Sequence, residues 1–206
     1  MNRLQLNTLG VVVAVLLFIF MNKNPNQTST ITVSKQDTIV AFGDSITYGY
    51  GVALEESYPE QLQKLLGVEV VNAGISGEES AEGLVRLPSL LEAKPKVVIL
   101  CHGGNDILRQ RSTLNLQKNL LEMIKLIQAS GAEVLLVGVP NFGLLGFKPH
   151  PLYKEIAQQT NVLFEEDVLS FVEADNSLKI DAIHPNQKGY EIMAKAFGKY
   201  IGVKEN

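Results

Sequence analysis

Short apolar runs alternate with amphipathic stretches along the chain from residue 38 onward. Runs that are apolar almost throughout predict strands covered on both faces, as in a parallel sheet, and they lie at residues 38–42, 69–71, 97–101, 134–139 and 161–164. Apolar residues at helical spacing predict helices between them, at residues 58–66, 81–91, 114–129, 152–159 and 186–200. Because strands that alternate with helices form right-handed βαβ units, we expect one three-layer α/β domain with a parallel sheet of about five strands. A functional site would lie at the carboxyl ends of those strands.

The N-terminal segment departs from this pattern. Residues 9–21 carry no charge, Arg3 precedes them, and a polar stretch rich in Asn, Thr, Ser and Gln follows at residues 22–36. A membrane span needs about 20 mostly apolar residues, and the core of a signal peptide needs roughly 7–15 behind a positive start. Because no Ala-x-Ala follows the run, we favour an uncleaved hydrophobic helix that anchors the protein in a membrane, with a cleaved export signal as the alternative. A buried core helix is disfavoured because the segment is apolar on all faces.

The chain therefore divides into an N-terminal anchor or signal at residues 1–21, a polar linker at residues 22–36 and one domain at residues 37–206. Arg3 and the terminal amine precede the apolar run, and Lys23 follows it. This small difference in positive charge favours an N-terminus on the inside of the membrane and a domain on the outside. We expect a bacterial membrane protein with a single N-terminal anchor and a periplasmic or extracellular domain. Release into the periplasm after signal cleavage is the alternative.

Composition narrows the classes of function. The chain has 206 residues, a formal net charge of −4 and one cysteine, Cys101. This length suits one domain, and clustered Lys and Arg for nucleic-acid binding are absent. A single cysteine excludes an internal disulfide, and we expect Cys101 to be a buried strand residue rather than a reactive thiol. We expect no cofactor and no metal ion, and the oligomeric state stays open, a monomer being compatible with the sequence.

Small and polar residues gather in four segments near predicted strand ends. Residues 43–47 place Ser45 where a strand turns into a helix or loop, although Asp44 and Ser45 are also good helix caps. Residues 72–77 are rich in glycine, which lets a backbone amide such as that of Gly74 approach a ligand, but they also fit an ordinary turn. Asn105 follows another strand and is suited to donate its side-chain amide to a negative oxygen, or to form an Asx turn.

The fourth segment pairs a carboxylate with an imidazole. Asp181 precedes His184 by three residues, so it can hold one ring nitrogen and leave the other free as a base. Pro185 biases His184 away from helical dihedrals and opens the last helix. His102 and His150 lack such a partner and are interpreted as structural, with a pocket-lining role left open for His102.

Together these residues predict acyl transfer. His184 would remove the Ser45 proton, and Ser45 would attack an ester carbonyl. The backbone amides of Ser45 and Gly74 and the Asn105 side chain would hold the oxyanion. Asp181 would fix the His184 tautomer and stabilise the imidazolium.

Four blocks also carry a resemblance to a known superfamily. They read FGDSITYGYG, VVNAGISGEESAEGLVRLPSLL, GGNDILR and DAIHPNQKGY. In order and rough spacing they match the GDSL/SGNH hydrolases, and from residue 37 the chain resembles in particular the bacterial thioesterase I/lysophospholipase/arylesterase branch. The resemblance implies a flavodoxin-like sheet, the signature residues Ser45, Gly74, Asn105 and His184, and Asp181 as the triad acid. It also implies an esterase or lipase acting on lysophospholipid, aryl ester or acyl-CoA.

One loop departs from the expected pattern. Residues 141–147 are rich in glycine and apolar side chains, without the charges expected of a close thioesterase I relative. We expect substrate contacts from Asp44, Phe142, Leu144 and Ile183. A medium or long acyl chain is the preferred substrate, because an anchor would place the site near lipid; short aryl or acetyl esters fit almost as well. The expected partners are thus a small-molecule ester or lipid and, through the N-terminal segment, a membrane, with no nucleic acid.

Other classes of protein fit less well. An α/β-hydrolase needs G-x-S-x-G, and Thr47 stands where Ser45 would need its second glycine. A nucleotide-binding module would need a Walker sequence or a G-x-G-x-x-G motif, and this sequence has neither. A metal hydrolase would use Asp44, Asp106, Asp181 and His184, whose spacing matches no known ligand motif. An acyltransferase or carbohydrate acetylesterase on the same fold, and an inactive binding or scaffold module, stay open as alternatives.

Overall fold

The computed structural model describes residues 30–141 and 147–204, and within them a five-stranded parallel sheet forms the centre of the domain. Its strand order is β3-β2-β4-β5-β6. The strands are β2 (Thr38–Gly43), β3 (Glu69–Gly74), β4 (Val97–Cys101), β5 (Glu133–Val137) and β6 (Leu163–Glu165). Every residue of β4 is buried, because helices cover both of its faces. The predicted α/β fold with a parallel sheet of five strands is confirmed.

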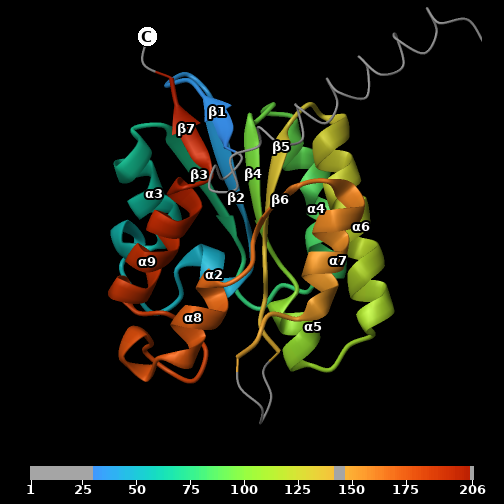
Figure 1. Ribbon diagram of the computed structural model, residues 1–206, viewed down its shortest axis with the longest axis vertical. Helices are drawn as coiled ribbons and strands as arrows, with labels where there is room; N and C mark the ends of the chain where they lie inside the picture. The colour runs from blue at the N-terminus through green and yellow to red at the C-terminus, as the bar shows by residue number, and fades with distance from the viewer. Residues whose placement is uncertain (1–29, 142–146, 205–206) are drawn as a thin grey trace, which may run out of the picture.

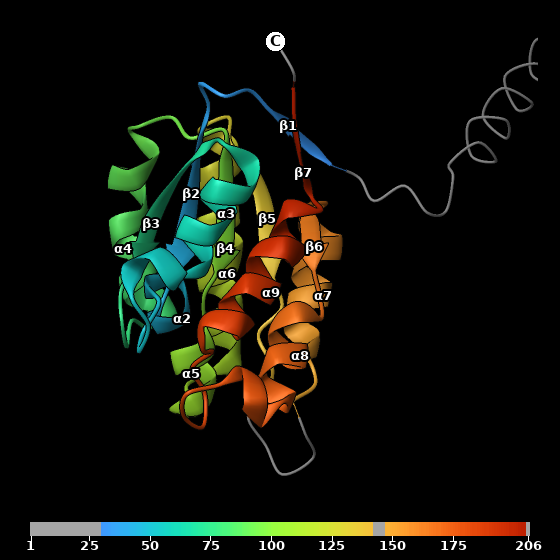
Figure 2. The ribbon, with the colours of Figure 1, turned by 90° about the vertical axis from the view of Figure 1, so that its left-hand side faces the viewer.

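Helices form a layer on each side of this sheet (Figures 1 and 2). On one side lie α3 (Tyr58–Leu66), α8 (Val168–Ala174) and α9 (Gln187–Gly198), and α3 and α8 both pack against α9. On the other side lie α4 (Ser80–Leu91), α5 (Gly104–Leu108), α6 (Thr113–Ala129) and α7 (Pro151–Thr160), where α6 contacts the other three. Short 3-10 turns at Leu54–Glu56 and Asn176–Leu178 complete the connections.

The order of the strands fixes where a site can form. From β2 the chain passes through α3 to β3 at one edge, then returns through α4, on the opposite side of the sheet, to β4. Gly43 at the end of β2 pairs with Gly74 of β3 and with Cys101 of β4, so three strands end at one level. In sheets of this kind a crevice opens where the strand order reverses. Here that point lies between the carboxyl ends of β2 and β4.

The predicted long helices are confirmed with small shifts at their ends. The last helix begins at Gln187, one residue later than predicted, because Asn186 caps it by accepting hydrogen bonds from the N–H groups of Lys188 and Gly189. The fifth strand begins at Leu163 rather than residue 161, because Asn161 has a φ of 53° and ends α7. Three helices of four to seven residues, α2 (Ser45–Tyr48), α5 and α8, were not predicted. They are too short to show helical periodicity.

A second, two-stranded parallel sheet joins β1 (Ile31–Val33) to β7 (Ile201–Val203). Residues 31–33 were predicted as part of a polar linker, and that interpretation is wrong for them. Ile31 and Val33 are 2% and 1% exposed, because they pack into the core beside the end of the chain. Their pairing partner is too distant in sequence for a local pattern to show it.

The predicted hydrophobic helix at residues 9–21 lies outside the described residues. Within residues 30–141 and 147–204, no helix is both long enough and apolar enough to cross a membrane.

Candidate active site

Ser45 opens the short helix α2 directly after β2. Asp44 caps this helix, since its Oδ1 accepts a hydrogen bond from the Ile46 N–H at 3.1 Å. Thr47, fully buried, is hydrogen-bonded to the Tyr58 hydroxyl at 3.0 Å and so holds α2 against α3. Asp44, and not Ser45, therefore acts as the cap, which leaves the Ser45 hydroxyl for other partners.

The Ser45 hydroxyl meets an imidazole from the far end of the chain. Ser45 Oγ lies 3.0 Å from His184 Nε2, and His184 Nδ1 lies 2.8 Å from Asp181 Oδ2. Asp181 Oδ1 also accepts hydrogen bonds from the backbone N–H groups of Ile183 and His184, both at 2.8 Å. The structure thus brings together the serine, histidine and aspartate that the sequence predicts as a group.

The charge on Asp181 is stabilised locally. Partial burial acts to raise the pKa of its carboxyl, but the backbone N–H groups of His184 and Ile183 and the His184 ring outweigh that effect and lower the pKa to about 2. Asp181 is therefore ionised at neutral pH and accepts the proton of His184 Nδ1. In the neutral imidazole that bond places the ring proton on Nδ1 and leaves Nε2, which faces Ser45, free to accept a proton; this is the tautomer that a general base needs.

The loop that carries Asp181 and His184 is narrow and closed at its base. Lys179 pairs with Pro185 across it, and the Ile180 N–H donates to the His184 carbonyl at 2.9 Å. Lys179 Nζ donates to the Ala182 carbonyl at 3.2 Å inside the loop. The Tyr50 ring packs on the His184 ring with 4.4 Å between centroids. These contacts limit the movement of the imidazole.

Gly74 ends β3 where α2 passes very close. A Cβ on Gly74 would lie 2.1 Å from the Tyr48 nitrogen, so this position admits only glycine without a shift of the backbone. The Gly74 N–H donates to the Asn72 Oδ1 at 3.0 Å, and Asn72 Nδ2 donates to the Tyr48 carbonyl at 3.2 Å. Asn72 therefore ties the end of β3 to α2, a role that the sequence did not reveal.

Asn105 lies in α5, directly after β4. Its Nδ2 donates to the Glu78 carbonyl at 3.0 Å and, at 3.4 Å, to Asp44 Oδ2. Burial raises the pKa of Asp44 from its ordinary value, although nearby histidines and the Ile46 N–H oppose the shift. Asp44, 4% exposed, thus links the helix that carries Ser45 to Asn105. Its predicted contact with substrate stays a prediction.

The other predicted residues fall as follows. His102 is fully buried, and His150 caps α7 by accepting from the Leu152 N–H, so both have the structural role first assigned to them. Cys101 is buried in β4, and burial raises the pKa of its thiol. Ile183 is half-buried in the loop that carries Asp181 and His184. Phe142 and Leu144 lie outside the described residues.

A partly buried ion pair beside the site was not predicted. Arg86 of α4 binds both carboxylate oxygens of Glu78, at 2.6 and 2.7 Å. Arg86 is the one basic residue in the largely apolar helix α4, and nothing in the sequence indicates Glu78 as its partner.

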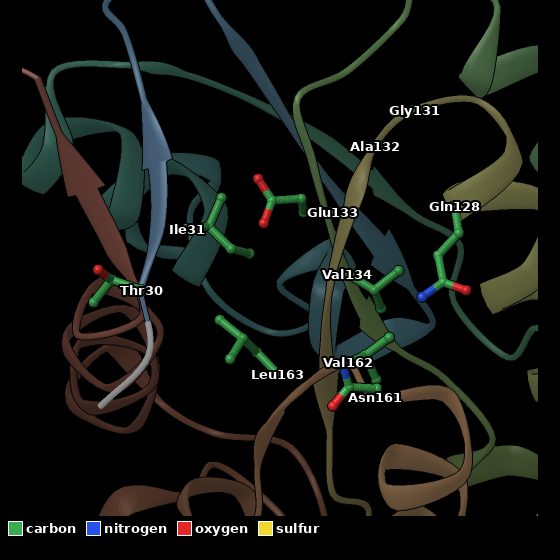
Figure 3. Close-up of a pocket in the computed structure, with 10 residues that line it drawn as sticks. All are labelled: Thr30, Ile31, Gln128, Gly131, Ala132, Glu133, Val134, Asn161, Val162 and Leu163. Atoms are coloured by element: carbon green, nitrogen blue, oxygen red, sulfur yellow. The ribbon is translucent and has the colours of Figure 1, made fainter. Parts of the chain in front are cut away.

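A cavity of about 590 Å³ lies away from this chemistry (Figure 3). Its walls include Glu133 and Val134 at the start of β5 and Leu163 at the start of β6. It therefore opens at the amino ends of the strands, whereas Ser45 lies at the carboxyl ends, and it takes no part in the site.

Comparison with known proteins places this geometry in a family. Residues 41–192 match the GDSL-like lipase/acylhydrolase family. The chain belongs to this family. It is 38% identical over 159 residues to Esterase TesA of Pseudomonas aeruginosa, an alignment that covers 72% of this chain and 79% of that protein.

Two further relatives agree. Over 180 residues this GDSL-family chain is 29% identical to thioesterase 1/protease 1/lysophospholipase L1 of Escherichia coli K12, covering 84% of this chain and 86% of that one. The crystal structure of the psychrotrophic esterase EstA from Pseudoalteromonas sp., inhibited by monoethylphosphonate, matches with a TM-score of 0.72 and 29% identity, over 80% of this chain and 96% of that one. The chain is accordingly a GDSL-type serine ester hydrolase.

Proposed function

We propose that Ser45 is the nucleophile, His184 the general base and Asp181 the orienting acid of this ester hydrolase. One observation carries the proposal, namely the unbroken chain from Ser45 Oγ to His184 Nε2 at 3.0 Å and from His184 Nδ1 to Asp181 Oδ2 at 2.8 Å. His184 takes the proton as Ser45 Oγ attacks the ester carbonyl, then returns it to the leaving alcohol or thiol. Water, activated by the same imidazole, releases the acid from the acyl-enzyme.

The tetrahedral oxyanion is held by the Ser45 N–H, the Gly74 N–H and the Asn105 Nδ2. Support comes from position, since Ser45 and Asn105 follow β2 and β4 and Gly74 ends β3, so that all three lie at the carboxyl ends of neighbouring strands. The Gly74 N–H now donates to the neutral Asn72 Oδ1, and Asn105 Nδ2 donates to the neutral Glu78 carbonyl at 3.0 Å and, in a longer bond of 3.4 Å, to Asp44 Oδ2. An anionic oxygen is the stronger acceptor for such donors. Loss of one donor in such a site typically costs about 10²–10³ in rate.

The substrate is an acyl ester or thioester with a medium or long chain. Support comes from large apolar side chains that lie close in sequence to the proposed site residues and are between 38% and 53% exposed. They are Tyr48 and Tyr50 after Ser45, Ile75 after Gly74, Leu108 after Asn105 and Ile180 before Asp181. They offer an apolar surface to an acyl chain.

The N-terminal segment does not add to this argument. β1 lies at the end of the domain opposite α2 and α5 (Figure 1), so the chain enters the domain far from Ser45. A membrane anchor would therefore not by itself bring the site to lipid. That residues 9–21 anchor the domain on the outer side of a bacterial membrane, or direct its export to the periplasm, remains a proposal, and cell fractionation with protease accessibility tests it.

Hydrolysis of p-nitrophenyl esters from acetyl to palmitoyl tests the function. We expect the full chain to cleave them, with a maximum beyond the butyryl ester, and we expect Ser45→Ala and His184→Ala to remove the activity while leaving the thermal unfolding transition intact. Activity confined to acetyl esters would overturn the chain-length proposal alone. A folded Ser45→Ala variant as active as the wild type would overturn the assignment of the nucleophile.

A further inference from the structure

Arg86 and Glu78 form an ion pair at the carboxyl ends of β2 and β3, next to Ser45 and Gly74. The guanidinium binds the carboxylate through two bonds, Nε to Oε1 and Nη2 to Oε2, and the two side chains are 21% and 5% exposed. Burial acts to raise the pKa of Glu78, but hydrogen bonds from His102 and Arg86 outweigh it, so the pKa lies below its usual value. Glu78 is therefore ionised at neutral pH and faces the guanidinium as a carboxylate.

Arg86 also binds the backbone of two strands. Its Nη2 donates to the Ala73 carbonyl at 2.8 Å and to the Gly43 carbonyl at 3.3 Å, and its guanidinium lies over the Phe42 ring, 4.3 Å from the centroid. Gly43 is two residues before the nucleophile, and Ala73 directly precedes Gly74. One side chain thus contacts the ends of both β2 and β3, which are already paired through Gly43 and Gly74.

Glu78 connects the ion pair to Asn105, the third of the proposed oxyanion donors. Its backbone carbonyl accepts the bond from Asn105 Nδ2, and its Oε2 lies 3.0 Å from His102 Nε2. The Gly103 N–H donates to His102 Nδ1 at 3.0 Å, so the proton of the neutral ring lies on Nε2 and forms the hydrogen bond to Glu78 Oε2. Gly83 of α4 lies so close that a Cβ there would be 2.4 Å from His102 Nε2. The start of α5 is therefore tied to Glu78 through both the Asn105 side chain and His102.

The chemistry of the pair suits positioning more than stability. Ion pairs away from water add little net stability compared with apolar packing, because desolvation offsets much of their attraction, although removing one partner alone leaves an unpaired charge and destabilises the fold. A guanidinium nevertheless presents donors in a rigid planar fork, so it can bind a carboxylate and backbone carbonyls at fixed angles. Such a group can hold several backbone segments at one spacing.

We propose that Arg86 and Glu78 are positioning residues that hold the Ser45, Gly74 and Asn105 segments at the spacing needed to bind the oxyanion. The proposal rests on the function proposed for these residues. Neither side chain reaches the ester itself. Their loss displaces the donors without touching Asp181 or His184, which lie on a separate loop.

The test compares kcat, KM and the pH profile of ester hydrolysis in Glu78→Gln, Arg86→Lys and Arg86→Met. We expect Arg86→Met to lower kcat by about 10²-fold, the loss expected when reacting groups are misplaced by roughly 1 Å. KM should stay within about threefold, because the bond to the oxyanion forms only in the transition state. Arg86→Lys should recover part of kcat, because an ammonium keeps the charge but not the fork.

Arg111→Met is the matched control. Arg111 pairs with Glu79, the residue next to Glu78 in the same loop, but this pair lies at the surface, with Arg111 57% exposed. Exposed ion pairs contribute little to stability, so we expect the kcat, KM and pH profile of Arg111→Met to equal those of the wild type. The midpoints of the pH profile should also be unchanged in the Glu78 and Arg86 variants, because the triad loop is not altered.

The outcomes separate the two proposals. An inactive wild type, or an active Ser45→Ala variant, would refute the proposed function itself. An active wild type with an inactive Ser45→Ala and unchanged kcat in folded Glu78→Gln and Arg86→Met would refute only the positioning role. Equal losses in kcat and binding, a shifted pH profile, or failure of both Glu78→Gln and Arg86→Lys to fold would also refute it, because the pair would then serve the fold and not the oxyanion.

Discussion

Gly74→Ala is the substitution whose effect follows most directly from the structure. The added Cβ would lie 2.1 Å from the Tyr48 nitrogen and 2.6 Å from the Thr47 carbonyl carbon. Ordinary contact distances between such atoms are about 3.5 Å. All of these neighbours are backbone atoms, so no side chain can rotate away, and α2 must move from the end of β3 by on the order of 1 Å.

This movement would displace Ser45, the proposed nucleophile, because α2 carries it at its first position. A misplacement of about 1 Å costs on the order of 10²-fold in rate. Crowding of this kind also destabilises the fold by about 1–3 kcal/mol. We therefore expect kcat/KM for p-nitrophenyl butyrate to fall about 10²-fold, with a fold that still forms.

Gly202→Ala in β7 is the matched control. A Cβ there would lie 3.9 Å from its nearest neighbours, the Ile31 carbonyl oxygen and the Thr30 hydroxyl, so it fits without a shift. Steady-state kinetics and thermal unfolding of both variants decide the matter. A folded Gly74→Ala enzyme with the kcat/KM of Gly202→Ala would show that the close approach of α2 to β3 does not position Ser45.

Three further predictions concern charge and burial. Asp181→Asn should lower kcat by about 10⁴-fold, as loss of the orienting acid does in such triads. The pKa of Asp181 falls from 3.8 to about 2 on folding, so its contribution to stability should be present above pH 3.8 and lost as the pH falls through about 2. Acid denaturation of the wild type and Asp181→Asn measures that contribution. Glu173 is fully buried beside Lys179, and burial, partly offset by Lys179, raises its pKa from 4.5 to about 8. Its protonated form is favoured in the folded state, so the wild type should lose stability relative to Glu173→Gln as the pH rises from 4.5 to 8, and equal urea midpoints of the two proteins at both pH values would contradict this. The Cys101 thiol, buried and with a raised pKa, should react with a thiol reagent only after denaturation.

The parts of the fold that repeat along the chain could be predicted from the sequence. Fully buried strands such as β4 give apolar runs, and long helices such as α6 give a clear stripe, so both are visible in local pattern. The pairing of β1 with β7 was missed because it joins the two ends of the described chain. The short helix α2 was missed because its start is set by the Asp44 side chain rather than by periodicity.

The candidate site divides in the same way. Asp181 and His184 lie three residues apart, so their contact is local and could be predicted, while Ser45 was placed by its position at a strand end. The pairing of Glu78 with Arg86 could not be predicted, because α4 must first fold to bring the two together. The carbonyls of Gly43 and Ala73 that Arg86 binds are backbone groups, which leave no mark in the sequence.

Labelling with a fluorophosphonate, read by intact mass and peptide mapping, tests the central claim most directly. Such a reagent is attacked by an activated serine and leaves a tetrahedral phosphorus on it. We predict one adduct on Ser45 of the wild type with complete loss of esterase activity, much slower labelling of His184→Ala, and none of Ser45→Ala. An adduct on another residue, or an enzyme that keeps its activity after Ser45 is fully labelled, would contradict the assignment of Ser45 as the nucleophile.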